Sequence, residues 1–191
     1  MDTLKLVRLD KRRMGDFERL HARKEFRGCY CAVWTAHGPD WDERCLQRPT
    51  ENLEHVRSRV VEGAHVGYLA IREEDGAVVG WAGAGPKSSF PLLAQRPASR
   101  QGESEGTWSV VCLSVPFPCR GLGYAGRIVE LLVEEARRAG VRRVEAYPVE
   151  PADERQAQRG SRKFYEALGF TVAGEESEGE VRHLRMEKAL G

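Results

Sequence analysis

Stretches of alternating or continuous apolar residues recur along the chain and predict strands. Residues 4–9 alternate apolar and charged positions, as a half-buried strand does. Residues 67–72 and 77–83 are largely apolar and flank a Glu-Glu-Asp-Gly turn, and Asp-Gly between two such runs is a strong hairpin signal. Residues 107–115 are typical of a buried strand. The first half of the chain is therefore expected to contain a strand, a hairpin and a further strand.

Helical periodicity lies between these strands. Asp10 is placed to cap a helix that ends before Gly28, and Asn52 is placed to cap a second helix. In the longest helical pattern, apolar positions recur every three or four residues up to Gly140, which is expected to stop the helix. A shorter helix is expected over residues 161–168.

The remaining segments complete a mixed fold. Further strands are expected at 141–149 and in a last hairpin formed by 170–173 and 181–186, whereas 94–106 is a polar loop. The elements follow the order β-α-α-β-β-β-α-β-α-β-β, with no internal repeat and no evident domain boundary. We therefore predict one mixed α/β (α+β) domain over residues 1–191.

Composition excludes several classes of protein. The 191 residues are 41% hydrophobic and 31% charged, which is typical of a soluble globular chain. Lys and Arg (30) balance Asp and Glu (29), so no broad basic surface is available for nucleic acid. No apolar run approaches the roughly 18 residues that span a bilayer, and the first residues lack the apolar core of a signal peptide. Five cysteines without a secretion signal favour reduced thiols. We expect a cytoplasmic protein that binds neither nucleic acid nor membrane.

The chemistry is concentrated in residues 115–126, Val-Pro-Phe-Pro-Cys-Arg-Gly-Leu-Gly-Tyr-Ala-Gly, which connect a predicted strand to the long helix. Glycines allow a ligand to approach the backbone closely, and the free N–H groups at a helix start point toward an anion. The helix dipole adds about 0.3–1 kcal/mol for each favourable charge contact. The segment therefore predicts a phosphate-binding loop.

One interpretation of these glycines is the Gly-x-Gly-x-x-Gly fingerprint of dinucleotide-binding folds, with Glu145 at a tolerable distance for a ribose contact. That fingerprint begins directly at the strand end, whereas residues 116–120 intervene here. Residues 146–191 are also too few to complete a doubly wound sheet. A nicotinamide-dependent enzyme is therefore the less favoured interpretation.

A second pattern covers more of the chain. Residues 120–125 fit Gln/Arg-x-x-Gly-x-Gly/Ala, and they resemble the pyrophosphate loop of the GCN5-related N-acetyltransferase (GNAT) family. Upstream, residues 108–115 resemble the family's fourth strand. Downstream, residues 144–147 resemble the fifth strand, and residues 163–170 match the family's Phe-Tyr-x-x-Leu-Gly-Phe signature. The three signals occur in the family's order and at its spacing.

The resemblance implies a single-domain GNAT fold, a twisted and mostly antiparallel sheet of about seven strands flanked by helices. A bulge in strand four splays it from strand five, and acetyl-CoA lies in the opening. The acetyl-CoA-binding core would span about 107–172, and about 10–65 would wall the acceptor side. Pantetheine amides would pair with the backbone at Leu113 and Val115. The residues expected to bind the pyrophosphate or to fix its loop are Arg120, Gly121, Leu122, Gly123, Tyr124 and Ala125.

The implied reaction is attack of a neutral amine on the thioester, with departure of a thiolate. Tyr165 matches the family tyrosine that protonates the leaving sulfur, and a phenol with a pKa of about 10 suits a general acid. For the general base, Glu145 is the tentative assignment, with Glu150 and the acids within 40–43 as alternatives. No metal is expected, although acetyl-CoA is required as co-substrate.

The acceptor side is less defined. The Cys29-x-Cys31 segment resembles that of a bacterial GNAT subgroup, which carries a Cys-x-Cys segment after helix one. We interpret the two cysteines first as buried thiols, second as part of a pocket wall and third as metal ligands. The aromatics at 30–41 and the nearby acids hint at a cationic, partly apolar amine. The expected partner is a primary amine of a small molecule or peptide. Pairing through C-terminal strands, common in the family, makes a homodimer an option. A non-catalytic acyl-CoA-binding sensor on the same fold is the alternative function.

Overall fold

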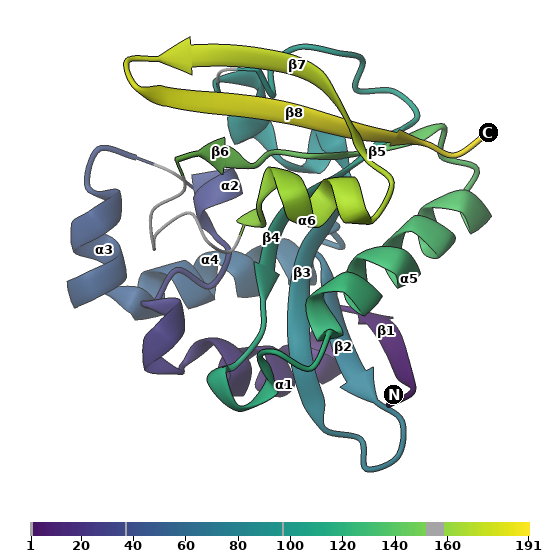
Figure 1. The fold of residues 1–191 in the computed structure, drawn as a ribbon. Coiled ribbons are helices and arrows are strands. Elements are labelled where there is room, and N and C mark those ends of the chain that lie inside the picture. The colour runs from purple at the N-terminus through teal and green to yellow at the C-terminus, as the bar shows by residue number, and fades with distance from the viewer. Residues whose placement is uncertain (1, 37, 97, 152–158) are drawn as a thin grey trace.

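One twisted sheet with helices on both faces forms the framework of the protein (Figure 1). The computed structural model describes residues 2–36, 38–96, 98–151 and 159–191, and every structural statement below concerns these residues. Within them, no helix is long and apolar enough to cross a membrane.

Eight strands make up the sheet, and their order is β1-β2-β3-β4-β5-β8-β6, with β7 paired to β8 outside this path. Among the strands of the described residues, only β4 and β5 pair in parallel, so the expected mixed and mostly antiparallel sheet is confirmed. The strands are β1 (Leu4–Arg8), β2 (Tyr68–Arg72), β3 (Val78–Pro86), β4 (Thr107–Ser114), β5 (Arg143–Ala146), β6 (Val149–Glu150), β7 (Thr171–Glu178) and β8 (Val181–Ala189).

The eighth strand arises because the strand expected at 141–149 is interrupted. Tyr147 and Pro148 separate β5 from β6, and proline has no N–H to donate to a ladder. β5 pairs with β8 through Ala146, and β6 pairs with β8 again from Val149. The break therefore turns the chain away from β4.

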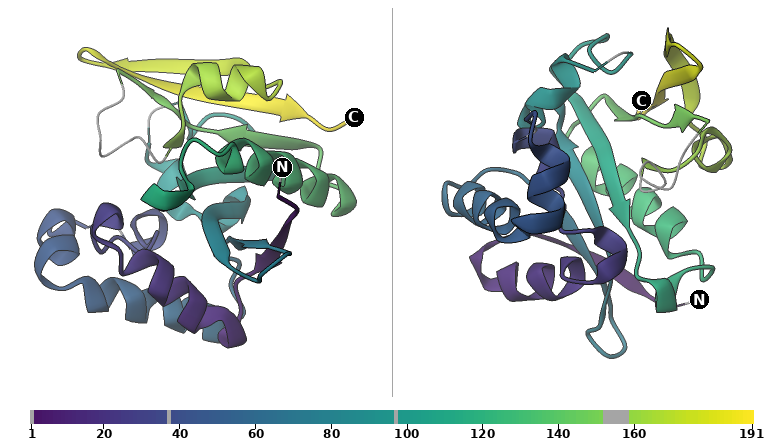
Figure 2. Two further views of the ribbon diagram at one scale, coloured as in Figure 1. Left: turned by 60° about the horizontal axis from the view of Figure 1, so that its bottom comes forward. Right: turned by 90° about the vertical axis from the view of Figure 1, so that its left-hand side faces the viewer.

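In the part of the chain that the structure describes, six α-helices cover the two faces of the sheet (Figure 2). The amphipathic helix α5 packs its buried residues against the core that α6 also covers, and α1 and α4 pack on the opposite core. The helices are α1 (Met14–His21), α2 (Val33–Ala36), α3 (Trp41–Gln47), α4 (Pro49–Val61), α5 (Tyr124–Arg138) and α6 (Arg162–Ala167).

Of the two expected helix caps, the one at Asn52 is wrong and the one at Asp10 is confirmed. Helix α4 begins at Pro49, which suits the first helical turn, so Asn52 lies inside the helix instead of capping it. Asn52 is fully buried and donates a 2.9 Å hydrogen bond to the carbonyl of Gly28. Asp10 accepts hydrogen bonds from the N–H groups of Arg12 and Arg13 and so caps a 3-10 turn that leads directly into α1, which ends at His21, before Gly28 as expected. The short helices α2 and α3 carry too few turns to show a periodicity.

The sheet opens between β4 and β5. Their pairing runs from Thr107 opposite Arg143 to Val110 opposite Ala146 and then stops. At this point the register between β3 and β4 shifts: Gly83 faces Cys112 while Ala84 faces Val110, which is a one-residue bulge in β4. The expected splay of strands four and five is thus confirmed, and the rest of β4 has a strand on one side only.

Candidate active site

The glycine-rich loop after β4 forms an open cradle of backbone N–H groups. Gly121 (φ 76°) and Gly123 (φ 80°) adopt the left-handed conformation, which glycine reaches without the cost that a Cβ imposes. Helix α5 starts at the next residue, Tyr124, and the N–H groups of its first turn have no acceptor within the helix. A Cβ built on Gly121 would meet no atom within 4 Å. The loop therefore has both the donors and the space that an anion needs.

Arg120 ties this loop to the end of β4. Its Nε donates a 3.0 Å hydrogen bond to the carbonyl of Val115, and its guanidinium lies 4.2 Å from the centre of the Phe117 ring. The side chain is exposed, so these contacts leave part of the guanidinium open to solvent.

The side chains at the start of α5 point in different directions. Leu122 is exposed, whereas Tyr124 is buried and its hydroxyl donates to Asp2 and contacts Arg72 at 3.4 Å. Ala125 is half-buried. Tyr124 is therefore occupied by the protein, and only the backbone N–H groups of this turn remain for a ligand.

The free edge of β4 lies next to the loop. Leu113 pairs with Ala82 of β3 and packs its side chain in the core beneath α5, and Val115 follows directly after the strand. On the other edge, the structure places no strand beside β4 beyond Val110. Backbone groups there can pair with an extended ligand as an added strand would.

Tyr165 of α6 is fully buried, and its hydroxyl has no hydrogen-bond partner among the described residues. Its ring is held edge-on by Phe164 and Phe170, with centroids 5.0 and 5.2 Å away. Burial raises the pKa of Tyr165 above its ordinary value, and Cys112 of the splayed part of β4 adds to the rise. A buried hydroxyl left unpaired costs about 1–3 kcal/mol. This geometry fits a phenol that stays protonated and meets its partner only when a ligand is bound.

Glu145 of β5 is fully buried within a network of donors. Its Oε2 accepts hydrogen bonds from Lys87 Nζ at 2.8 Å and from the Tyr147 hydroxyl at 2.7 Å, and its Oε1 accepts one from Arg185 at 3.0 Å. Both carboxylate oxygens are therefore occupied by hydrogen bonds within the protein. Sequence reasoning missed these partners, because Lys87 and Arg185 are distant in the chain.

Four of the five cysteines form two side-chain contacts between thiols. Cys31 and Cys112 are in side-chain contact, and this contact raises the pKa of Cys31. Cys29 and Cys45 make a second such contact, which raises the pKa of Cys45. All five cysteines are free thiols, and no group of three or more metal-binding side chains occurs in the described part of the chain. The first interpretation of the Cys-x-Cys segment, buried thiols, fits Cys31, whereas Cys29 is only half-buried.

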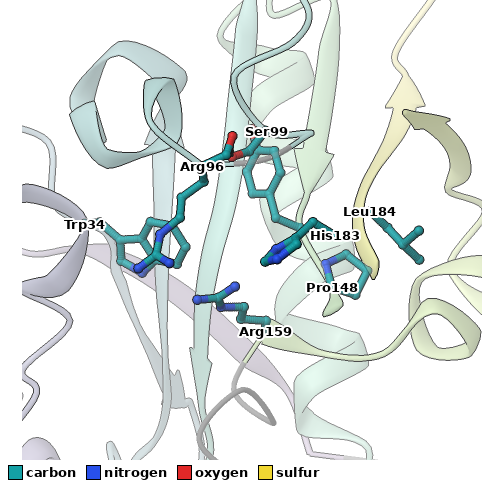
Figure 3. A pocket seen from close by; sticks show the side chains of 8 residues that line it. Trp34, Arg96, Ser99, Pro148, Arg159, His183 and Leu184 are labelled. Carbon is teal, nitrogen blue, oxygen red and sulfur yellow. Dashed lines mark hydrogen bonds between the residues drawn. The ribbon is translucent and has the colours of Figure 1, made fainter. Parts of the chain in front are cut away.

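A small cavity lies beside Tyr147 and Pro148, the two residues that separate β5 from β6 (Figure 3). The space in it that a water molecule can occupy is only about 10 Å³. Residues from five separate segments line it: Trp34, Arg96, Ser99, Tyr147, Pro148, Arg159, His183 and Leu184. The acids at 40–43, which were expected on the acceptor side, do not line it. Asp40 and Glu43 instead pair with Arg48, at 2.8 and 3.7 Å.

The sequence pattern of the acetyltransferase (GNAT) family matches residues 21–170. The chain therefore belongs to this family of acyltransferases. No curated protein matches the sequence, so the family is the finest level at which sequence comparison places the chain.

Solved structures with the same fold include three acetyltransferases. AAC(6')-Ib in complex with ribostamycin and coenzyme A is 14% identical, with 98% of this chain and 94% of that chain covered and a TM-score of 0.66. PaiA N-acetyltransferase from Thermoplasma acidophilum in complex with coenzyme A is 12% identical, with 98% and 99% covered and a TM-score of 0.59. An N-acetyltransferase from Staphylococcus aureus Mu50 is 17% identical, with 99% of each chain covered and a TM-score of 0.55. At these low sequence identities, the similarity shows a shared fold and nothing further.

Proposed function

We propose that the protein transfers the acetyl group of acetyl-CoA directly to a primary amine of a small molecule. The observation that carries the proposal is the hydroxyl of Tyr165, which is fully buried, unpaired among the described residues and close to the splayed part of β4. A catalytic phenol in this family position needs a leaving sulfur beside it, and the opening between β4 and β5 is where a thioester would enter. Acetyl-CoA supplies that thioester.

Each part of the site has a role in this reaction. The backbone N–H groups from Gly121 to Ala125 bind the pyrophosphate, and Arg120 fixes their loop through its bond to the Val115 carbonyl. The free edge of β4 near Leu113 holds the amides of the pantetheine arm. Tyr165 donates its proton to the departing sulfur, and the raised pKa of the phenol keeps that proton in place until then.

The general base would take the proton that the attacking amine loses. Glu145 stays a candidate from the sequence, but its burial and its three hydrogen-bond donors favour a structural role, because they occupy both oxygens of the carboxylate. Tyr147 links Glu145 to the cavity and also contacts Ser109 at 2.7 Å. A proton leaving the amine through water is the alternative route.

Three finer proposals accompany this function. Structures of AAC(6')-Ib contain the amine ribostamycin, which supports a small molecule over a protein as acceptor. Strand β7 pairs with β8 alone and is largely exposed, which supports a homodimer formed through this C-terminal hairpin. Five free thiols support a cytoplasmic location, and Cys29 and Cys31 support membership of the Cys-x-Cys subgroup.

The alternative is an acyl-CoA-binding sensor without turnover. The experiment that separates the two measures release of free thiol from acetyl-CoA with a panel of amines, together with the affinity for acetyl-CoA. Tyr165→Phe is compared with Tyr68→Phe, a control in which another buried tyrosine of the core loses its hydroxyl. The proposal expects Tyr165→Phe to lower kcat by about 100-fold while the Kd for acetyl-CoA stays within about twofold, and Tyr68→Phe to leave both unchanged.

Two results would contradict the proposed enzymatic function. Binding of acetyl-CoA without thiol release from any amine would favour the sensor. Equal kcat values for the wild type and Tyr165→Phe would remove Tyr165 from the chemistry.

A further inference from the structure

We propose that Cys31 and Cys112 are a site of reversible oxidation: a hydroperoxide joins their free thiols in a disulfide bond, and this bond impairs acetyl transfer. The disulfide bond itself does not depend on the proposed function. Its effect on turnover does rest on that function, and the two parts are tested separately below.

Segments that are distant in the chain bring the two thiols together. Cys31 lies in the connection between α1 and α2, and Cys112 lies on β4. Both are buried, and their side chains are in contact. Gly83 of β3 pairs with Cys112, and a Cβ built on Gly83 would lie 2.5 Å from Cys31 Sγ and 3.2 Å from Cys112 Cβ. The two cysteines therefore meet at a position where glycine leaves room for them.

The turn that carries Cys31 has an unusual backbone. Arg27 (φ 52°), Tyr30 (φ 47°) and Cys31 (φ 55°) all adopt the left-handed conformation, although each has a Cβ. This conformation is costly for such residues, and it persists where the surrounding structure fixes it, often at functional sites. Tyr30 and Cys31 are both buried. The strained turn therefore holds the Cys31 thiol against β4.

Of the two thiols, Cys112 is the one that would react first with an oxidant. Its Sγ lies 3.5 Å from the hydroxyl of Ser114. Contact with Cys31, this hydroxyl and the charge of Arg159 lower the pKa of Cys112, and together they outweigh the effect of burial. The contact with Cys112 raises the pKa of Cys31, which keeps its proton. Because the thiolate is the nucleophile in cysteine oxidation, Cys112 attacks and Cys31 resolves.

The reaction balances with hydrogen peroxide as the oxidant. The Cys112 thiolate attacks one peroxide oxygen, the O–O bond breaks, and hydroxide leaves and takes the proton that Cys112 gave up. The sulfur of Cys31 then attacks the resulting sulfenic acid, so that the S–S bond forms and the S–O bond breaks. The second hydroxide leaves as water with the proton of Cys31. The two thiols lose two electrons, one peroxide is reduced to two waters, and a dithiol reverses the change by exchange.

The thiol pair lies at the reacting end of the proposed site. Cys112 is two residues beyond Val110, where the pairing of β4 with β5 stops. It is also close enough to Tyr165 for its charge to raise the pKa of the phenol. A disulfide bond draws two sulfurs that are only in contact to about 2.05 Å, so the turn or the splayed part of β4 has to move. A shift of about 1 Å in a site of this kind can lower the rate about 100-fold.

The second thiol contact, between Cys29 and Cys45, provides the matched control. Both of these cysteines are half-buried, and Cys45 belongs to α3. Cys45→Ser removes this contact and leaves Cys31 and Cys112 unchanged. A general effect of peroxide on half-buried thiols is therefore distinguished from an effect at the proposed pair.

The first measurement detects the bond in the full chain. The protein is treated with hydrogen peroxide, its remaining thiols are alkylated, and tryptic peptides are analysed by mass spectrometry. Trypsin places Cys31 in the peptide 28–44 and Cys112 in the peptide 101–120. We expect these peptides to be linked in the wild type and in Cys45→Ser, and the link to be absent in Cys31→Ser and in Cys112→Ser.

The second measurement follows the acetylated amine by mass spectrometry after peroxide is removed, and compares each variant with its own untreated sample. Oxidation should lower kcat at least about 10-fold in the wild type and in Cys45→Ser, and dithiothreitol should restore it to within about twofold. Cys31→Ser should keep its kcat after dithiothreitol treatment, because its Cys112 sulfenic acid is reduced by the same reagent. In Cys31→Ser no linked peptides should accompany any loss.

The outcomes separate the inference from the proposed function. Oxidation of Cys112 without linked peptides, or a link that leaves kcat unchanged, would overturn the inference and leave the proposed function intact. Linked peptides in a protein that acetylates no amine before treatment would support the disulfide bond and contradict the proposed function. Neither linked peptides nor acetylation would overturn both.

Discussion

Replacement of Gly121 by alanine tests the phosphate-binding loop. Gly121 has φ 76°, and a Cβ there would meet no protein atom within 4 Å. An alanine in the left-handed conformation costs about 1–2 kcal/mol, which in a chain of this size lowers Tm by about 2–8 °C. The added methyl would enter the space assigned to the pyrophosphate. We expect it to remove about one charged hydrogen bond and to raise the Kd for acetyl-CoA by about 10- to 100-fold.

Gly63 offers a matched control. It has φ 82°, also has nothing within 4 Å of a built Cβ, and lies beyond the end of α4. Thermal unfolding should therefore show similar losses for Gly121→Ala and Gly63→Ala, whereas calorimetry should show weaker acetyl-CoA binding for Gly121→Ala alone. Unchanged affinity in Gly121→Ala, or equal losses of affinity in both variants, would refute the placement of the pyrophosphate.

Three further predictions concern buried groups. Gly160→Ala should lower kcat at least about 10-fold. The new Cβ would lie 2.8 Å from Tyr165 Cε2, so the Tyr165 ring would have to move. A kcat equal to that of the wild type would contradict this contact. Glu145→Gln should destabilise the protein to urea by about 3–5 kcal/mol, since it leaves buried Lys87 without its carboxylate at 2.8 Å; a loss below 1 kcal/mol would be inconsistent with this. Burial lowers the pKa of His21 from 6.5 to about 4, so its neutral form contributes stability above pH 6.5 that declines as the pH falls toward 4. Urea unfolding should show a decline of up to about 1.4 kcal/mol per pH unit, and His21→Leu should reduce that slope.

The sequence predicted the parts of the fold that local pattern controls. The hairpin of β2 and β3 follows from its Asp-Gly turn, and Gly76 in that turn has φ 72°. The helix expected to end at Gly140 is α5, in which the apolar positions face the core. The glycines at 121 and 123 lie where a loop with positive φ requires them.

Long-range contacts account for what the sequence could not show. Asparagine commonly caps helices, but the side-chain amide of Asn52 donates a hydrogen bond to the carbonyl of Gly28, which is distant in the chain. Glu145 was assigned as a base because it is a carboxylate on strand five, while its buried cationic partners come from residues 87 and 185. Arg96 and His183 lie 87 positions apart, counted from their residue numbers, and meet only once the sheet has formed. No spacing rule could place them in one cavity.

The most direct test of the central claim follows the acetyl group itself. The protein is incubated with acetyl-CoA labelled in the acetyl group and with the amine panel, and the products are analysed by mass spectrometry. The account predicts the label on the amine nitrogen of an acceptor, in an amount equal to the thiol released, with the transfer strongly reduced in Tyr165→Phe. Tight binding of acetyl-CoA with no label on any amine would contradict it.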